Sequence, residues 1–208
     1  MFITFEGIDF CGKSTQVELL KNHLISLNKE VKILREPGGT ELSEEIRKIL
    51  LDKKHNKMVM ETEIFLFAAS RAQIVREKIR PYLEKGFYVI SDRFHDSTTA
   101  YQGYGRGIPL EIVNNIHQLA IGHTVPDITF FLDIPVEEAE KRKALNRHVE
   151  LDRIETSENN FYMRVRNGYL DLAKTESRFK VIDGMQKIED VQKEILKQMS
   201  LLEKKEKV

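Results

Sequence analysis

The chain has 208 residues, of which 41% are apolar and 32% are charged, and its 33 basic residues balance its 33 acidic residues. A chain of this length and composition is expected to fold as one globular domain. Because the net charge is zero, the chain has no general electrostatic attraction to nucleic acid or to an anionic membrane. We therefore expect neither as a partner.

Cysteine content and the N-terminal residues predict the compartment. The single cysteine, Cys11, excludes an internal disulfide and is typical of a reducing environment. No apolar run approaches the roughly 20 residues of a membrane span, and the first residues, "MFITFEG", lack the basic segment of a signal peptide. We therefore predict a cytoplasmic protein.

Five short runs rich in β-branched and aromatic residues predict buried strands, and helical patterns lie between them. Apolar residues three and four positions apart predict one helix from Val17 to Leu27 and another from Ile188 to Leu202. This alternation predicts an α/β fold with a doubly wound, five-stranded parallel sheet and helices on both faces. The predicted strands are 2–7, 31–35, 88–92, 128–133 and 179–183.

The segment 142–160 is polar and interrupts this alternation between the fourth and fifth predicted strands. No change in composition along the chain marks a second domain. We therefore predict a single domain over residues 1–208, with a short lid at about 142–156.

The loop after the first predicted strand fits the phosphate-binding pattern G-x-x-x-x-G-K-[ST], from Gly7 to Ser14. The strand before it and the amphipathic helix after it predict a P-loop NTPase fold, in which loop N–H groups and the helix N-terminus bind phosphate oxygens. Lys13 is expected to reach the β- and γ-phosphates, and the Ser14 hydroxyl to bind Mg²⁺. Proximity to the helix N-terminus predicts a lowered pKa for the Cys11 thiol and reaction with thiol reagents. The predicted triphosphate site comprises Gly7, Ile8, Asp9, Phe10, Cys11, Gly12, Lys13, Ser14 and Thr15.

Polar residues also follow the second and third predicted strands, and ligands bind outside the carboxyl ends of parallel strands. Glu36 comes directly after 31–35, and Asp92 ends 88–92 beside Arg93. An aspartate in this position can hold Mg²⁺ or its waters, and an arginine can bind phosphate. We therefore expect separate segments to converge on one site.

Several other residues are ambiguous by pattern alone. Arg47 lies in a predicted helix, where a lone arginine is ordinarily a solvated charge. Phe67 lies four residues before Arg71 and shares a helix face with it, so it can stack on a base, but beside Phe65 and Leu66 the pattern alone favours a core position. The dense polar segment after Arg93 favours a site and contains Thr98, Tyr101 and Gln102.

Together these segments resemble the thymidylate kinases of the bacterial type, over nearly the whole chain. The resemblance implies Mg²⁺-dependent transfer of the γ-phosphate of ATP to dTMP, giving dTDP for dTTP synthesis, and it implies a homodimer. Besides the phosphate loop with its acid, Asp9, the ordered set comprises "REPGGT" at 35–40, "LFAASR" at 66–71, "DR" at 92–93, "AYQGYGRG" at 100–107, "PDITFFLDIP" at 126–135 and "LDRIE" at 151–155.

The resemblance also implies how the acceptor is held. Arg47 and Arg93 match arginines that hold the dTMP phosphate. Phe67 matches a ring that stacks on thymine, and Arg71 matches a donor to an exocyclic oxygen of the base. Tyr101 matches a ring beside the sugar. The full dTMP site implied is Asp9, Glu36, Arg47, Phe67, Arg71, Arg93, Thr98, Tyr101 and Gln102.

The resemblance further implies an arginine at the transferring phosphoryl group. One branch of the family carries it in the phosphate loop, where this chain has Phe10, and the other supplies it from the lid. Arg153 matches the lid segment best, Arg147 is the alternative, and Arg142 would lie along the adenine of ATP. Simple pairing of Arg153 with a neighbouring acid stays open. The implied catalytic set is Lys13, Asp9, Arg93 and Arg153, and the implied metal set is Ser14 and Asp92.

Two other functions stay open at the level of the sequence. A P-loop kinase could act on a deoxynucleoside or on a different monophosphate. A nucleotide-binding switch or scaffold would bind ATP without transferring phosphate, although the guanine-reading sequence Asn-Lys-x-Asp of regulatory GTPases does not occur in the chain. Product formation with a panel of acceptors separates these functions.

Overall fold

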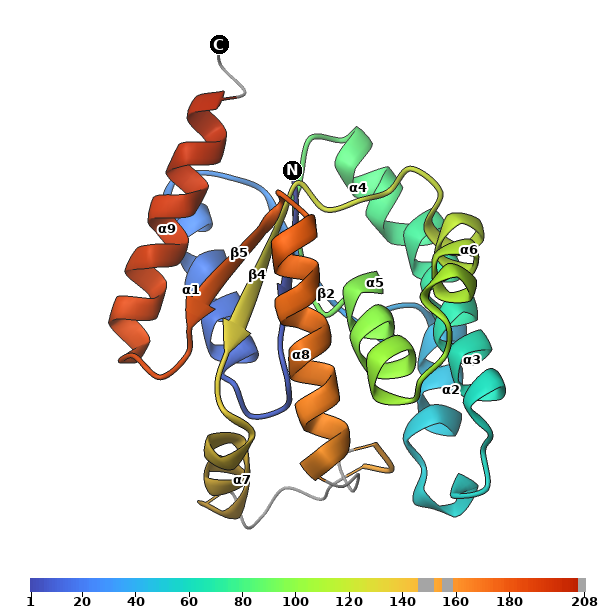
Figure 1. Cartoon of the computed structure of the whole chain (residues 1–208). Coiled ribbons are helices and arrows are strands. Elements are labelled where there is room, and N and C mark those ends of the chain that lie inside the picture. Colours follow the sequence, from blue (N-terminus) through green and yellow to red (C-terminus); the bar gives the residue numbers. More distant parts are fainter. Residues whose placement is uncertain (146–151, 155–158, 206–208) are drawn as a thin grey trace.

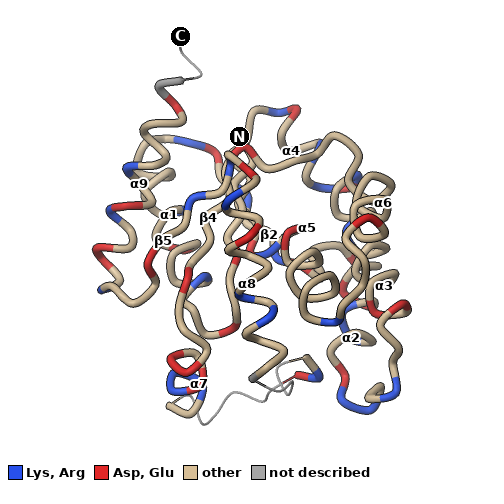
Figure 2. The backbone as a smooth tube through the Cα atoms, viewed as in Figure 1, with Lys and Arg blue, Asp and Glu red and all other residues tan. Residues whose placement is uncertain are grey.

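The structure is a computed structural model that describes residues 1–145, 152–154 and 159–205. Within these ranges, none of the helices combines the length and the apolar character that a membrane crossing requires. Figure 2 shows both basic and acidic residues on many of the helices, in keeping with the balanced charge of the chain.

Five parallel strands form one sheet in the order β2-β3-β1-β4-β5. Central strands of such a sheet are covered on both faces, which is why β1, with the sequence FITFE, is buried at every position, including Thr4 and Glu6. The bounds match the predicted strands, except that the first strand ends one residue earlier, before Gly7. The strands are β1 (Phe2–Glu6), β2 (Val31–Arg35), β3 (Tyr88–Asp92), β4 (Ile128–Asp133) and β5 (Phe179–Asp183).

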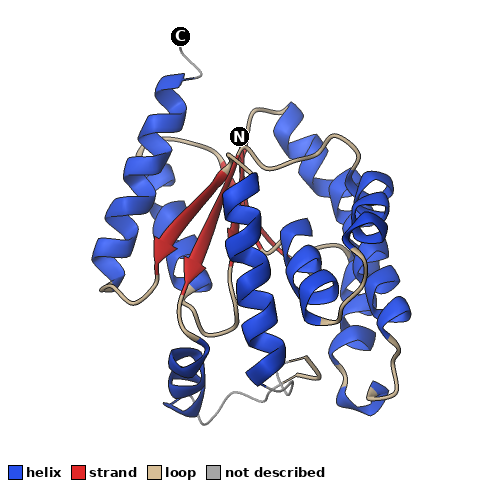
Figure 3. Cartoon of the chain, in the orientation of Figure 1, coloured by secondary structure: helices blue, strands red, loops and turns tan. Residues whose placement is uncertain are grey.

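Helices cover both faces of the sheet (Figure 3), so the predicted α/β fold is confirmed. One face is covered by α1 (Lys13–Ser26) and α9 (Ile188–Lys205), which pack against each other, and α8 (Asn159–Thr175) packs on β4 and β5 from the other face. The other helical segments are α2 (Glu41–Leu51), η1 (Lys53–His55), α3 (Met60–Ile74), η2 (Val75–Ile79), α4 (Arg80–Glu84), α5 (His95–Thr98), η3 (Thr99–Gly105), α6 (Leu110–Ile121) and α7 (Val136–Leu145).

α1 forms because one apolar stripe faces the sheet. Val17, Leu20 and Leu24 recur at three- and four-residue steps and are all buried. Leu27 follows the end of the helix and is 52% exposed, so the predicted helix is one residue too long at this point. α9 likewise buries part of the stripe that predicted it, including Val191, Ile195 and Met199.

The carboxyl ends of the strands point to one edge of the sheet, at the lower side of Figure 1. α7 follows β4 at this edge, and the backbone N–H of Arg153 donates to the carbonyl of Leu51 at the end of α2 (N···O 3.1 Å). The predicted lid at 142–156 therefore begins inside α7, and its residues 146–151 and 155–156 lie outside the described residues.

Candidate active site

Two cavities lie at the carboxyl edge of the sheet. The first, the base cavity, holds about 780 Å³ of open space, and the second, the loop cavity, holds about 1530 Å³. Asp9, Asp92 and Arg93 line both cavities, so the two spaces meet at these side chains. An arrangement of this kind lets two bound molecules approach each other across a common boundary.

The structure gathers most of the predicted site residues around these cavities. The base cavity is lined by every residue predicted to bind dTMP, which are Asp9, Glu36, Arg47, Phe67, Arg71, Arg93, Thr98, Tyr101 and Gln102. The loop cavity is lined by the phosphate loop from Asp9 to Thr15 and by Arg142. The buried residues Gly7 and Ile8 line neither cavity, and neither does Arg153.

The phosphate loop needs glycine where it approaches the end of β4. Gly7 has φ +141°, and a Cβ there would lie 2.7 Å from the carbonyl oxygen of Leu132 and 2.8 Å from Sγ of Cys11. Phe10, where this chain lacks the loop arginine, has φ +64°, a left-handed conformation that is uncommon for a large side chain. The Phe10 side chain nevertheless fits, because it lines the loop cavity and is only partly buried.

Lys13 is held inside the loop that it follows. Its ammonium group donates to the carbonyl oxygens of Gly7 at 3.1 Å and Ile8 at 3.0 Å, and the residue is only 7% exposed. The side chain is thus buried at the wall of the loop cavity, with its charge satisfied by backbone oxygens.

Cys11 does not have the lowered pKa that the sequence predicted. The residue is 2% exposed, and burial raises the pKa of its thiol, although nearby Lys13 acts in the opposite direction. Removal of the thiolate from water therefore outweighs the favourable charge and the helix N-terminus. The prediction of a readily ionised thiol is wrong, and with it the reason for expecting reaction with thiol reagents.

Asp9 and Arg93 form an ion pair at the boundary of the two cavities. Nη1 of Arg93 also donates to the carbonyl of Gly7 at 2.9 Å, and its Nη2 donates to the hydroxyl of Tyr101 at 3.1 Å. Burial by itself raises the pKa of Asp9, but Arg93 and Lys13 outweigh it and hold that pKa below its usual value. Asp9 is therefore ionised and is paired with the cation of Arg93, and both side chains line both cavities.

Ser14 and Asp92 lie together, and the Ser14 hydroxyl donates to Oδ2 of Asp92 at 3.0 Å. Among the described residues, no cluster of three or more His, Cys, Asp or Glu side chains could hold a metal by itself. Mg²⁺ in phosphoryl-transfer sites takes one or two protein oxygens and completes its shell with water and phosphate. The Ser14 hydroxyl at the loop cavity and the Asp92 carboxylate at both cavities fit that requirement.

Arg71 is fixed at the wall of the base cavity. It is 1% exposed, and its Nε, Nη1 and Nη2 donate to Oε2 of Glu36 at 2.6 Å, to Oγ1 of Thr98 at 2.8 Å and to the carbonyl of Phe94 at 3.1 Å. A guanidinium carries five N–H donors, so two remain for a bound molecule. Phe67, one helical turn earlier, lines the same cavity.

The pH dependence of stability tests the buried pair of Glu36 and Arg71. Burial raises the pKa of Glu36 to about 6 from 4.5, with Arg71 opposing the shift. The folded state then binds the proton more tightly, so Glu36 makes the free energy of unfolding fall by about 2 kcal/mol as pH rises from 4.5 through 6. Because E36Q lacks this dependence, its destabilisation relative to wild type should shrink by about 2 kcal/mol over that range. Urea unfolding at pH 4 to 7 measures the gap, and a gap that widens with pH would contradict the raised pKa.

Arg35 lines the base cavity beside Arg47, and the sequence patterns gave it no role. Nη1 of Arg47 donates to the carbonyl of Pro37 at 2.8 Å, while Nη2 of Arg35 pairs with Glu44 at 3.0 Å. Burial and the neighbouring Arg35 lower the pKa of Arg47. The signal for Arg35 was its place next to Glu36 at the end of β2, which also brings it to the carboxyl edge.

The arginines of the predicted lid take different positions. Nη2 of Arg153 pairs with Oε2 of Glu63 at 2.6 Å, and its Nε donates to the carbonyl of Leu50 at 2.9 Å. Arg142 bonds to Glu138 and to the carbonyl of Gly184 at the wall of the loop cavity. Arg147, the alternative at the transferring phosphate, lies outside the described residues.

Known thymidylate kinases are similar to this chain over nearly its whole length. Residues 5–195 match the family model described as thymidylate kinase. The thymidylate kinase of Kosmotoga olearia is 47% identical over 206 residues, which are 99% of this chain and 98% of that protein. The thymidylate kinase of Caldanaerobacter subterraneus subsp. tengcongensis is 49% identical over 197 residues, 94% of this chain and 93% of the relative. The crystal structure of the thymidylate kinase of Ehrlichia chaffeensis, 38% identical, superposes with a TM-score of 0.78 over 96% of this chain and 98% of that chain.

Proposed function

We propose that this chain, which belongs to the thymidylate kinase family, transfers the γ-phosphate of ATP to dTMP and forms ADP and dTDP. The observation that carries the proposal is the shared boundary of the two cavities at Asp9, Asp92 and Arg93. ATP in the loop cavity and dTMP in the base cavity would bring donor and acceptor phosphates together at these residues.

The reaction depends on the alignment of its two substrates more than on a general base. The attacking atom is a phosphate oxygen whose second pKa is about 6, so it is largely ionised at neutral pH. The protein must then hold two polyanions in line and offset their repulsion. Arg93 and Arg47 would hold the acceptor phosphate, and Lys13 would exchange its carbonyl partners for phosphate oxygens. Mg²⁺ held by Ser14 and Asp92 would neutralise charge on the donor phosphates.

The base cavity offers the groups that thymidine requires. The ring of Phe67 would stack on thymine, and the two remaining N–H groups of Arg71 would donate to an exocyclic oxygen of the base. Tyr101 would lie beside the sugar, with its hydroxyl between Arg93 and Asp9. Asp9, which accepts from that hydroxyl, would also accept from the 3′-hydroxyl of the sugar.

A coupled ADP-release assay tests the reaction with dTMP, dUMP, dCMP, dGMP and thymidine as acceptors. We expect the highest kcat/KM with dTMP. A preference for thymidine or for another monophosphate would assign a different P-loop kinase. ATP binding without dTDP formation at saturating dTMP would assign a switch or scaffold.

Phe67→Ala is expected to raise the Kd for dTMP by about 10-fold and to leave the Kd for ATP unchanged, because stacking on a base contributes about 1–3 kcal/mol. Calorimetric titration with each nucleotide measures both constants. Phe87→Ala is the matched control, since this partly buried ring precedes β3 at the opposite edge of the sheet. An unchanged Kd for dTMP in Phe67→Ala would mean that Phe67 serves only the core.

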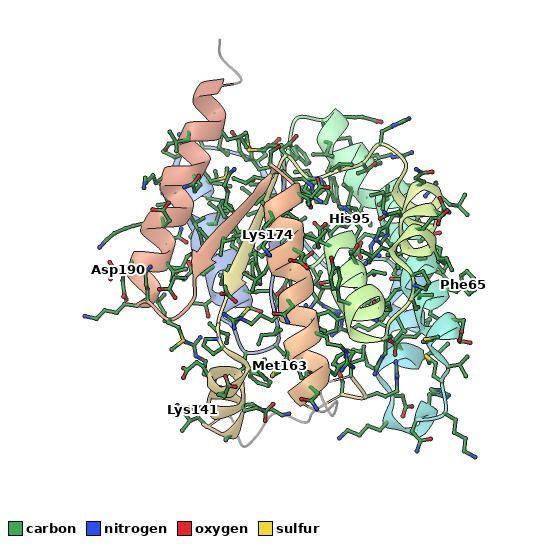
Figure 4. All side chains as sticks on the ribbon, viewed as in Figure 1. Phe65, His95, Lys141, Met163, Lys174 and Asp190 are labelled. Atoms are coloured by element: carbon green, nitrogen blue, oxygen red, sulfur yellow. The ribbon has the colours of Figure 1, made fainter. Side chains whose placement is uncertain are left out.

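We further propose that the protein is a homodimer that pairs through α3 and α6. These helices pack side by side and expose Phe65 (62%), Ile112 (49%) and Leu119 (80%). Figure 4 shows Phe65 on the outer side of α3, directed away from the sheet. Large apolar side chains exposed on two adjacent helices fit a protein interface. A cytoplasmic location belongs to the same proposal, and the single free cysteine supports it.

Phe65→Glu is expected to convert the dimer to a monomer, because a carboxylate opposite its own copy would be desolvated without a partner. Sedimentation velocity measures the mass of wild type and variant at micromolar concentration. Leu201→Glu is the control, since Leu201 is 48% exposed on α9, which packs on α1 and β5. A wild-type protein that sediments as a monomer would refute the proposed dimer.

A further inference from the structure

Glu63 is a buried carboxylate that the sequence patterns did not single out. It lies in the first turn of α3, and its side chain is 2% exposed. Its Oε1 accepts hydrogen bonds from Nε2 of Gln102 at 2.9 Å and from Nε of Arg106 at 3.2 Å. Its Oε2 accepts from Nη2 of Arg153 at 2.6 Å. One carboxylate therefore receives donors from the end of η3 and from the segment 152–154.

The surroundings keep Glu63 ionised. Burial alone raises its pKa, but Arg106, Gln102 and Arg153 outweigh that effect and hold the pKa of Glu63 below its usual value. The side chain is thus an acceptor at both oxygens at neutral pH. Any group that faces it from a fixed position must be a donor.

This requirement decides which way the amide of Gln102 points. A side-chain amide carries an acceptor at Oε1 and two N–H donors at Nε2, and the two ends differ little in shape. Turning the amide over would place Oε1 against the carboxylate of Glu63, where two acceptors repel. Nε2 therefore faces Glu63, and Oε1 faces away from it.

The free end of that amide belongs to the base cavity. Gln102 lines this cavity. Within the described ranges, no group donates a hydrogen bond to Oε1 of Gln102. This oxygen is also not fully buried, so it is open to the cavity. The polar side of the cavity thus presents an acceptor from Gln102 and N–H donors from Arg71.

We infer that Glu63 is a specificity-determining positioning residue, which holds the Gln102 amide so that the site accepts thymine and rejects cytosine. This inference rests on the proposed function and names what selects the base. Thymine presents a carbonyl oxygen at position 4 and an N–H at position 3, which complement the donors of Arg71 and the acceptor of Gln102. Cytosine reverses both, with an amino group at position 4 and a bare nitrogen at position 3. A site whose hydrogen-bonding groups are fixed rejects such a reversed partner because its own groups are left unpaired.

Glu63→Gln tests the inference. A neutral glutamine at this position can donate or accept, so the Gln102 amide can turn over and offer Nε2 to the bare nitrogen of cytosine. We expect the ratio of kcat/KM for dTMP to that for dCMP to fall about 10-fold or more, chiefly through KM for the pyrimidine nucleotides. KM for ATP should not change. Since Arg71 still disfavours cytosine, the ratio should fall without inverting.

Two matched controls separate this effect from others of the same substitution. Glu61→Gln removes the same charge from the same turn of α3 at an exposed position and should leave the ratio unchanged. Arg153→Ala removes another partner of Glu63 but leaves the carboxylate facing Gln102. It should likewise keep the ratio, whatever it does to kcat. A fall of the ratio in Glu63→Gln alone supports the inference.

The contrary outcomes are distinct. If Glu63→Gln lowers kcat/KM for dTMP and dCMP by the same factor, or leaves the ratio unchanged, Glu63 does not set base selection and the inference fails while the proposed function stands. If the wild type forms no dTDP, the proposed function fails and the inference with it. Should Glu63→Gln not fold, as judged by circular dichroism and ATP binding, Gln102→Met decides. A ratio that falls about 10-fold supports the inference, and an unchanged ratio overturns it.

Discussion

Lys13→Ala is expected to lower kcat by about 10³-fold, because removing one donor that stabilises developing charge costs about that factor. In the structure the ammonium group is buried at the wall of the loop cavity, and its partners are the carbonyls of Gly7 and Ile8. Phosphate oxygens can replace these neutral partners when ATP binds. The measurement is kcat at saturating ATP and dTMP.

Lys21→Ala is the matched control for this prediction. Lys21 lies two turns later on α1, is partly exposed and pairs with Glu18 at 2.9 Å, so its removal should change kcat by less than twofold. A loss of less than 10-fold in Lys13→Ala would show that the phosphate loop binds ATP without the lysine taking part in transfer.

Arg153→Ala is also expected to lower kcat by about 10³-fold, with little change in the Kd for dTMP, because an arginine at a transferring phosphoryl group is worth about 10³–10⁵ in related reactions. This role requires Arg153 to leave Glu63, since in the structure it lines neither cavity. Single-turnover formation of dTDP separates the chemical step from product release.

The other arginines of the predicted lid serve as comparisons. Arg142→Ala should raise KM for ATP more than it lowers kcat, because Arg142 lies at the wall of the loop cavity. A large loss of kcat in Arg147→Ala together with a small one in Arg153→Ala would move the role to Arg147. If Arg153→Ala lowers only the stability of the protein, Arg153 serves the folded structure and takes no part in phosphoryl transfer.

Much of the site could be predicted because its residues follow strand ends. Gly7, Glu36 and Asp92 come directly after or at the ends of three neighbouring strands, and a parallel sheet brings such ends to one edge. For Arg47 and Phe67 the bare patterns favoured a solvated charge and a core ring. Both line the base cavity, because α2 and α3 lie over the carboxyl edge and direct these side chains inward.

The remaining residues depended on distances that no local pattern contains. Glu63 meets Gln102, which is 39 positions later, and Arg153, which is 90 positions later. Cys11 stands at a helix N-terminus, which predicts a lowered pKa, but the fold buries it and raises that pKa instead. The local sequence shows which charges lie beside a group, but it does not show whether water reaches that group.

By itself the sequence determined the strands, the phosphate loop and the groups available to two phosphorylated molecules, because hydrophobic period and loop chemistry act over a few neighbouring residues. Only the tertiary structure decided that the two cavities meet at Asp9, Asp92 and Arg93, that Arg153 pairs with Glu63, and that the Gln102 amide presents its oxygen. These features arise from burial and from hydrogen bonds between segments far apart in the chain, which are set when the sheet and its helices pack together.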